Sequence, residues 1–133
     1  MEIKKITAFN MEEILNLYSS VGWTNYTERP QMLKQAYEHS LLVLGAYDEE
    51  KLVGIIRAVG DGFSVVLIQD LLILPSYQRQ GIGSKLCREI LAIFSDVYQI
   101  QLLTDNTPKS IGFYQSIGFH KVDDLGCCAF LKM

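Results

Sequence analysis

The chain has little of what marks disulfide-rich or metal-binding proteins. It contains three cysteines, two histidines and three prolines among its 133 residues. Cys127 and Cys128 are adjacent, a spacing that suits neither an ordinary disulfide nor a tetrahedral zinc site. We therefore expect this pair and Cys87 to be reduced and mostly buried as small hydrophobic residues, and we expect no metal site.

An excess of positive charge and long apolar runs are also missing. Twelve Lys and Arg residues against fifteen Asp and Glu residues give a formal net charge of -3, and no run of Lys or Arg exceeds two. This balance argues against non-specific nucleic-acid binding as the main activity. No segment approaches the roughly 20 apolar residues of a membrane span, and the first residues lack the apolar core of a signal peptide. We predict a cytoplasmic protein with neither a nucleic-acid nor a membrane partner, and the sequence leaves a homodimer open.

The rest of the composition favours one folded domain. Hydrophobic residues make up 49% of the chain, and neither a Pro/Gly/Ser-rich linker nor an internal repeat interrupts them. A chain of this length buries most of its apolar surface around a single core. We therefore predict a single domain over residues 1–133.

Hydrophobic periodicity predicts a mixed α/β chain. Asn10 and Glu13 form a capping box before a helix, and Pro30 opens a second helix. Residues 23–26 are expected to form a loop. The expected strands cover residues 3–8, 41–47, 52–59, 65–74, 99–104, 119–122 and 127–132, and further helices cover residues 84–95 and 108–117.

The segment Gln78-Arg79-Gln80-Gly81-Ile82-Gly83 carries the most specific signal. It lies between a buried strand and a helix, where N-terminal amide groups of the helix form a seat for a diphosphate. Gly81 and Gly83 let the backbone approach an anion closely, and Arg79 adds a positive charge. A Gly-x-Gly turn alone is a weak signal, because such turns also need glycine for steric reasons. The segment has neither the third glycine of a dinucleotide fingerprint nor the Gly-Lys-Ser/Thr of a P-loop.

Two motifs resemble the GCN5-related N-acetyltransferase (GNAT) family over nearly the whole chain. The first is the Q/R-x-x-G-x-G/A signature at residues 78–83, preceded by Asp70-Leu71-Leu72-Ile73-Leu74-Pro75. The second is F-Y-x-x-x-G-F at Phe113–Phe119. The resemblance implies the acyl-CoA N-acyltransferase fold, a mixed central sheet of about seven strands with helices on both faces. In that fold strands four and five splay apart, and the coenzyme enters between them.

The resemblance also implies acetyl-CoA as the co-substrate. The family usually has an asparagine where this chain has Thr107, which we expect to cap a helix; the displaced Asn106 is then the candidate for contact with pantetheine. Backbone amides of strand four would polarise the thioester carbonyl. The coenzyme-binding residues implied are Leu71, Leu72, Ile73, Gln78, Arg79, Gln80, Gly81, Ile82, Gly83, Ser84 and Asn106.

Two residues are candidates for catalysis. In the family the tyrosine at the position of Tyr114 is the usual general acid for the leaving thiolate; otherwise Tyr114 is an aromatic that holds a helix end. Asp70 is the candidate base that deprotonates the amine, or else a structural carboxylate paired with Arg57 across adjacent strands. A chain of water molecules ending on Asp70, Tyr77 or bulk solvent is a further alternative.

The acceptor pocket is expected near the first helices. Trp23 and Tyr26 could hold an amine by cation–π attraction, although Trp23 could simply fill the gap between helix and sheet. Together with Arg57 and Asp61 they resemble small bacterial members of the family and, more loosely, plant arylalkylamine acetyltransferases. Two further residues, Tyr37 and Phe63, are also expected to line this pocket.

We predict an N-acetyltransferase that transfers the acetyl group of acetyl-CoA to the primary amine of a small molecule, by direct attack in a ternary complex. The alternatives are a protein N-acetyltransferase, acting on lysine or an N-terminus, and a non-catalytic CoA-binding sensor or interaction module.

Overall fold

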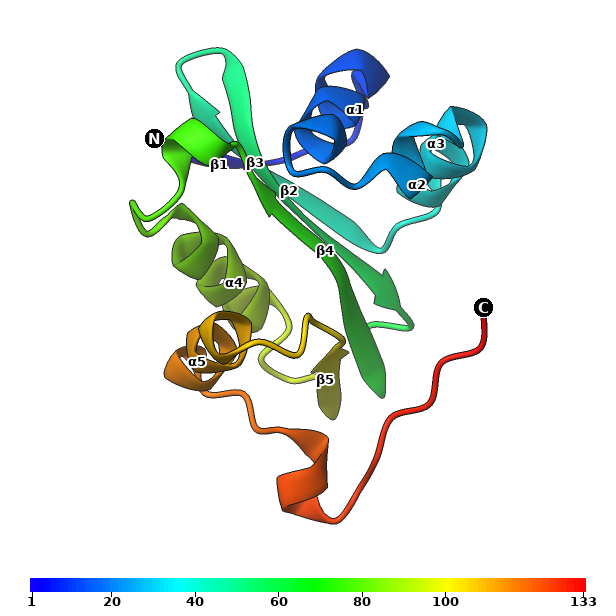
Figure 1. The fold of residues 1–133 in the computed structure, drawn as a ribbon, viewed down its shortest axis with the longest axis vertical. Coiled ribbons are helices and arrows are strands. Elements are labelled where there is room, and N and C mark those ends of the chain that lie inside the picture. Colours follow the sequence, from blue (N-terminus) through cyan, green and yellow to red (C-terminus); the bar gives the residue numbers. More distant parts are fainter. The chain divides into compact units, whose positions relative to one another are not determined.

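The computed structural model describes all 133 residues, which divide into two compact units, residues 1–102 and 103–133. The first unit holds a five-stranded sheet in the order β1-β2-β3-β4-β5 (Figure 1). Its strands are β1 (Glu2–Lys5), β2 (Leu42–Asp48), β3 (Lys51–Gly60), β4 (Val65–Ile73) and β5 (Gln99–Leu102). Neighbouring strands are antiparallel except β4 and β5, which are parallel.

Helices cover both faces of this sheet, as the resemblance implies. They are α1 (Met11–Ser20), α2 (Thr24–Thr27), α3 (Pro30–Glu38) and α4 (Ile82–Ile93), with a 3-10 turn, η1 (Pro75–Tyr77), before α4. Figure 1 shows α1, α2 and α3 on one side of the sheet and α4 on the other. The core of the unit lies between these layers. No helix in the structure is long and apolar enough to cross a bilayer.

The first helices begin where the sequence places them. Asn10 precedes α1, and its side-chain oxygen accepts a hydrogen bond from the Glu13 amide at 3.3 Å. Pro30 occupies the first turn of α3, where its missing N–H has no partner to lose. The loop expected over residues 23–26 is wrong, because Thr24–Thr27 form the short helix α2.

A β-bulge divides β4 into two halves. Arg57 of β3 lies opposite Asp70, but the next residue, Ala58, lies opposite Ile68, so Gln69 is an extra residue without a partner. Directly opposite residues share a face, and Arg57 and Ala58 point to opposite faces of β3. The bulge therefore turns Asp70 away from the face of Ile68, toward α1 and α3.

Strand β4 continues beyond the end of β5, which leaves a gap in the sheet where the resemblance places the coenzyme. β5 pairs only with Val65–Ile68 of β4, so the rest of β4, residues 69–73, has no strand on that side (Figure 1). The parallel ladder thus ends at the bulge. Beyond it the backbone of β4 faces an open side of the sheet.

The second unit begins with α5 (Pro108–Ile117) and a 3-10 turn, η2 (Val122–Leu125). The Thr107 hydroxyl oxygen accepts from the Ser110 amide at 3.2 Å, which confirms Thr107 as the helix cap. The strands expected over residues 119–122 and 127–132 are wrong, and with them the count of seven. A strand needs a neighbour for its backbone groups, and these segments have none within the chain.

The three cysteines differ in their exposure to solvent. Cys87 is buried on α4, as expected, but Cys127 and Cys128 are exposed, contrary to the prediction of burial. Burial raises the pKa of the Cys87 thiol to about 12, since the thiolate would lose its hydration.

Candidate active site

The turn before α4 exposes a row of unused hydrogen-bond donors. None of the backbone N–H groups from Arg79 to Ser84 is bonded to an acceptor in the chain. Arg79 and Gly81 have φ values of 63° and 82°, in the left-handed region. Alternating left- and right-handed residues turn successive N–H groups toward one concave side, where an anion can bind. The positive end of the α4 dipole adds to this preference.

Positive side chains border the same turn. An open hollow of about 330 Å³ lies beside it and includes Lys85 and Arg88. Its full lining is Gly81, Ser84, Lys85, Arg88, Glu89 and Ala92. Gln80 and Gln78 hold the turn in place: Gln80 Nε2 donates to the Ser76 carbonyl at 3.3 Å, and Gln78 Nε2 donates to the Ile73 carbonyl at 3.0 Å.

The open side of β4 presents backbone groups of alternate residues. Leu74 N–H donates to the Val53 carbonyl at 2.9 Å, which fixes the alternation of the antiparallel ladder. By that alternation Leu72 bonds to β3, whereas Leu71 and Ile73 direct their N–H and C=O groups away from it. Leu71 and Ile73 can therefore donate to an extended ligand in the gap, and Leu72 contributes a buried side chain instead.

Four polar side chains are buried together beneath α1 and α3. We call this group, Arg57, Asp70, Tyr18 and Tyr37, the buried tetrad. Asp70 Oδ2 accepts from Arg57 Nε at 2.9 Å and from the Tyr18 hydroxyl at 2.7 Å. The Tyr18 hydroxyl also lies 2.9 Å from that of Tyr37, from which it accepts because its own proton is given to Asp70. The Arg57 guanidinium carbon lies 5.3 Å from the centre of the Tyr37 ring.

The environment of the tetrad favours neutral tyrosines and a charged arginine. Burial is the main cause that raises the pKa of Tyr18 and of Tyr37, since a phenolate would be desolvated. Burial alone would lower the pKa of Arg57, but the Asp70 carboxylate and its hydrogen bond raise it overall. Asp70 is 2% exposed, and its Oδ1 atom is buried without a hydrogen-bond partner.

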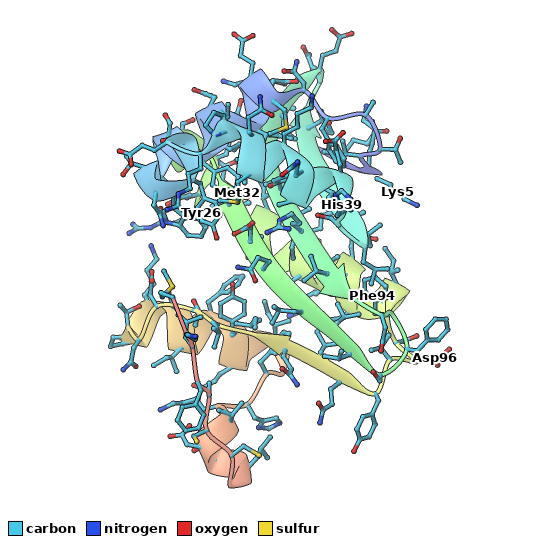
Figure 2. The ribbon with its side chains drawn as sticks, turned by 90° about the vertical axis from the view of Figure 1, so that its right-hand side faces the viewer. Lys5, Tyr26, Met32, His39, Phe94 and Asp96 are labelled. Carbon is cyan, nitrogen blue, oxygen red and sulfur yellow. The ribbon has the colours of Figure 1, made fainter.

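An aromatic cluster adjoins the tetrad on its helical side. The Tyr18 ring lies 5.1 Å from that of Tyr26 and 6.0 Å from that of Trp23, and the Trp23 and Tyr26 rings lie 6.2 Å apart. Trp23 and Tyr26 are half-buried, unlike Tyr18. Figure 2 shows Tyr26 in the same helical layer as Met32 of α3. The structure thus brings Trp23, Tyr26, Tyr37 and Arg57 together around Tyr18.

Asp61 and Phe63 do not join this group. The Asp61 carboxylate accepts from the Ser64 hydroxyl and from the backbone amides of Phe63, Ser64 and Val65, so it organises its own loop. The hydrogen bond from Ser64, followed by those amides, lowers the pKa of Asp61. Phe63 is 83% exposed. The structure gives both residues a place in the β3–β4 turn, with no contact to the aromatic cluster.

Tyr114 lies on α5 in the second unit. Its ring is half-buried and packs edge-on against Phe113, at 5.0 Å, and Phe119, at 5.8 Å. Gly118 ends the helix with a φ of 106°, which is why this motif has glycine there. Asn106 is exposed one residue before the Thr107 cap.

Comparison with known proteins identifies the family. The family model described as "Acetyltransferase (GNAT) family" matches residues 8–119. The chain belongs to the GNAT acetyltransferase family. A solved GNAT-family acetyltransferase from Streptococcus pneumoniae TIGR4 is 48% identical, with a TM-score of 0.91, over 99% of this chain and 96% of that one.

Two curated relatives extend the comparison. An uncharacterized ycf52-like N-acetyltransferase from Prochlorococcus marinus is 32% identical over 95% of this chain and 71% of its own length. Serotonin N-acetyltransferase 2, chloroplastic, from Oryza sativa subsp. japonica is 27% identical over 85% of this chain and 58% of its own length. Like other GNAT proteins, this chain is an acetyl-CoA-dependent acyltransferase.

Sequence reasoning did not find two residues that shape the candidate site. Tyr18 falls on the apolar face of α1, four residues after Ile14, so its sequence pattern is that of a core residue. Gln69 is an amide in a nearly continuous apolar run, and this break was the one available sign of a bulge. Within the chain, no group of three or more His, Cys, Asp or Glu side chains could hold a metal ion.

Proposed function

We propose that this protein transfers the acetyl group of acetyl-CoA to the primary amine of a small molecule with an apolar body. One observation carries the choice of acceptor: the half-buried rings of Trp23 and Tyr26 meet Tyr18 directly beside the buried tetrad. Aromatic faces attract ammonium groups and alkyl or aryl surfaces alike. A small amine could use both, whereas an extended peptide would need a groove.

Most residues that would hold acetyl-CoA lie in the first unit, on β4 and on the turn before α4. The free amides from Arg79 to Ser84 suit the pyrophosphate, and the positive charges of Lys85 and Arg88 suit other phosphate oxygens. The outward N–H and C=O groups of Leu71 and Ile73 suit the amides of pantetheine. Asn106 stays a proposed contact of pantetheine, on the family pattern.

The reaction needs few side chains. The amine nitrogen bonds to the thioester carbonyl carbon, the carbon–sulfur bond breaks, and the sulfur leaves as a thiolate. Backbone N–H groups of β4 would stabilise the negative charge on the carbonyl oxygen. We assign Tyr114 as the acid that gives its proton to the thiolate.

Asp70 is proposed as a positioning residue. Its Oδ2 atom is already shared by Arg57 and Tyr18, and the residue is 2% exposed, so its first role is to hold the Arg57 guanidinium and the Tyr18 ring in place. The amine would then lose its proton through water. The alternative, in which Asp70 itself is the base, is tested by a variant described below.

A protein acceptor is the second candidate function. One curated relative of this chain, from Glycine max, is named histone acetyltransferase TAP1, and it is 28% identical over 77% of this chain. The rice relative is named for a small amine. The rice name also places that protein in the chloroplast, so the cytoplasmic location of this chain stays a prediction.

Release of free thiol from acetyl-CoA, measured with a panel of acceptors, tests the proposal. We expect arylalkylamines to be acetylated faster than a histone-tail peptide or a peptide with a free N-terminus. Trp23→Leu should raise KM for the amine and leave acetyl-CoA affinity unchanged, and Leu41→Ala, at an exposed apolar position, is the control. Faster turnover of a peptide would favour a protein acceptor. Coenzyme binding without thiol release would favour the sensor.

A further inference from the structure

The turn between β2 and β3 contacts the segment that leads into α4. The hydroxyl of Tyr77, the last residue of η1, donates to Asp48 Oδ2 at 2.7 Å. Lys51 Nζ lies 5.5 Å from the centre of the Tyr77 ring. Asp48 and Lys51 lie directly opposite each other, where β2 ends and β3 begins. One turn therefore holds one side chain by two contacts, a charge-assisted hydrogen bond and a cation–π contact.

The hairpin is built so that these two groups lie together. Its turn has two residues, and the first of them, Glu49, has a φ of 56°, a positive value that two-residue hairpin turns use. A β-bulge leaves Val53 without a partner on β2 and bends this end of the hairpin. The Val53 carbonyl accepts from the Leu74 N–H at 2.9 Å, directly before η1. The backbone thus joins the end of the hairpin to the start of the same segment.

The contact of Tyr77 lies at the entrance to the row of free amides. Tyr77 is two residues before Arg79, where that row begins. Gln78 and Gln80 bond to carbonyl groups of their own segment, within residues 73–76. The Tyr77 side chain instead reaches a residue 29 positions away in the chain. It fixes the entrance of the turn against the sheet, which bonds within the segment cannot do.

The Tyr77 hydroxyl is poorly suited to take a proton from the amine. Its hydrogen bond to the Asp48 carboxylate is the main cause that raises its pKa, because a phenolate would lie beside another negative charge. The contacts of Tyr77 therefore suit a role in holding the turn better than the end of a water chain.

We propose that Tyr77 is a positioning residue for the coenzyme: held by the β2–β3 turn, it keeps the free amides from Arg79 to Ser84 in the arrangement that binds pyrophosphate. The inference rests on the coenzyme site proposed above. A segment that is already held in its bound arrangement loses less conformational entropy when the ligand arrives, so the affinity is higher.

Calorimetric titration with acetyl-CoA tests the inference on two single variants and their combination. Tyr77→Phe keeps the ring and removes the hydroxyl, and Asp48→Ala removes the acceptor of its hydrogen bond. Each should raise Kd by about 2- to 10-fold, the effect of losing one hydrogen bond. The double variant should raise Kd no further, because both changes remove the same contact. At saturating coenzyme, kcat should stay close to that of the parent.

The direction of the Asp48→Ala effect separates positioning from simple charge. The coenzyme is strongly negative, so the loss of a nearby carboxylate by itself should lower Kd. Glu50→Ala removes the same charge from the same turn and is the control, which should lower Kd or leave it unchanged.

Four results would overturn the inference. An unchanged Kd for both single variants would show that the contact does not matter, and a rise for Tyr77→Phe alone would indicate that the hydroxyl touches the coenzyme directly. An equal rise for Glu50→Ala would indicate a disturbed turn. A lower kcat for Tyr77→Phe with an unchanged Kd would place Tyr77 on the path of the proton.

Gly81→Val separates this inference from the coenzyme site on which it rests. If Gly81→Val abolishes binding and Tyr77→Phe leaves Kd unchanged, only the role of Tyr77 is wrong. If Gly81→Val binds acetyl-CoA as the parent does, the proposed coenzyme site is wrong, and the role of Tyr77 is wrong with it.

Discussion

Arg57 and Asp70 lie directly opposite each other on β3 and β4, and Arg57 Nε donates to Asp70 Oδ2 at 2.9 Å. Their side chains are 7% and 1% exposed, so this ion pair is shielded from water. Removing one partner of such a pair leaves the other charge buried alone, which is far more unfavourable than losing an exposed pair.

Asp70→Asn should lower the free energy of unfolding by about 3 to 5 kcal/mol, because Arg57 keeps its charge and loses its counter-ion. If Asp70 is a positioning residue, the same substitution should also lower kcat/KM by a factor that does not change with pH. Urea unfolding and a pH–rate profile on the same variant measure both effects. Asp96→Asn, an exposed residue, is the control and should stay within about 0.5 kcal/mol of the parent.

The pH–rate profile of Asp70→Asn also tests the alternative in which Asp70 is the catalytic base. A base must be ionised while the amine is protonated, so the loss would be greatest at low pH and would shrink as the solution itself deprotonates the amine. An Asp70→Asn variant with that profile and normal stability would make Asp70 the base.

Stability should fall as the pH rises above about 8.5, the ordinary pKa of a thiol. The pKa of Cys87 is raised to about 12 in the folded protein, so above pH 8.5 the unfolded chain loses a proton that the folded chain keeps. One such group gives a slope of up to about 1.4 kcal/mol per pH unit. The raised pKa of Tyr18 adds a further loss above about pH 10, the ordinary value for tyrosine.

Urea unfolding of the parent and of Cys87→Ala at pH 7 to 10 measures how much of this loss of stability comes from the Cys87 thiol. The variant is expected to be less stable at pH 7, because a buried side chain is shortened, but to have a flatter profile between pH 8.5 and 10. Parallel profiles for the two proteins would show that Cys87 does not cause the loss.

Gly81→Val should abolish the stabilisation that acetyl-CoA gives. A β-branched side chain does not tolerate a φ of 82°, so the turn must change and its amides must move. The parent should gain about 2.7 kcal/mol at a coenzyme concentration 100 times Kd. Thermal shift with and without acetyl-CoA provides the measurement.

Gly22→Val is the matched control for that variant. Gly22 has a φ of 79°, and at both glycines a Cβ would meet open space. The two variants should therefore lose similar stability, but only Gly81→Val should lose coenzyme binding. Equal coenzyme shifts for both variants would contradict the assignment of the amide cradle.

Tyr114→Phe should lower kcat by roughly 10- to 10,000-fold, the broad range around general-acid effects. The ring and its contacts with Phe113 and Phe119 remain, so acetyl-CoA affinity should be close to that of the parent. Steady-state kinetics and coenzyme titration separate the two effects. Tyr98→Phe, at an 82% exposed position, should change neither, and an unchanged kcat for Tyr114→Phe would make Tyr114 a packing residue.

Local sequence signals correctly predicted where helices begin, because helix starts depend on residues that are close together in the chain. The Asn10 cap, Pro30 and the Thr107 cap each fixed a helix start to the residue, because caps and proline act within one turn. The turn of Gly81 before α4 was predicted for the same reason.

Features that depend on distant partners were harder to predict. The strand expected over residues 127–132 has a strand-like composition but no neighbour within the chain, and sequence composition does not reveal where a neighbour comes from. The Asp70–Arg57 pair was one of two alternatives, because the choice depends on a bulge at Gln69. The contact between Tyr18 and Asp70 joins residues 52 positions apart, and no local pattern encodes it.

Because of the bulge at Gln69, mutations in the two halves of β4 should affect different layers of the protein. Before it, Val66 and Ile68 send their side chains to the layer of α4; after it, Asp70 and Leu72 send theirs to the layer of α1 and α3. Changes in the first half should therefore be compensated from α4, and changes in the second half from α1 and α3, beside the proposed acceptor pocket. Substrate preference can then be altered by laboratory evolution on one side of the sheet while the other side keeps the domain folded.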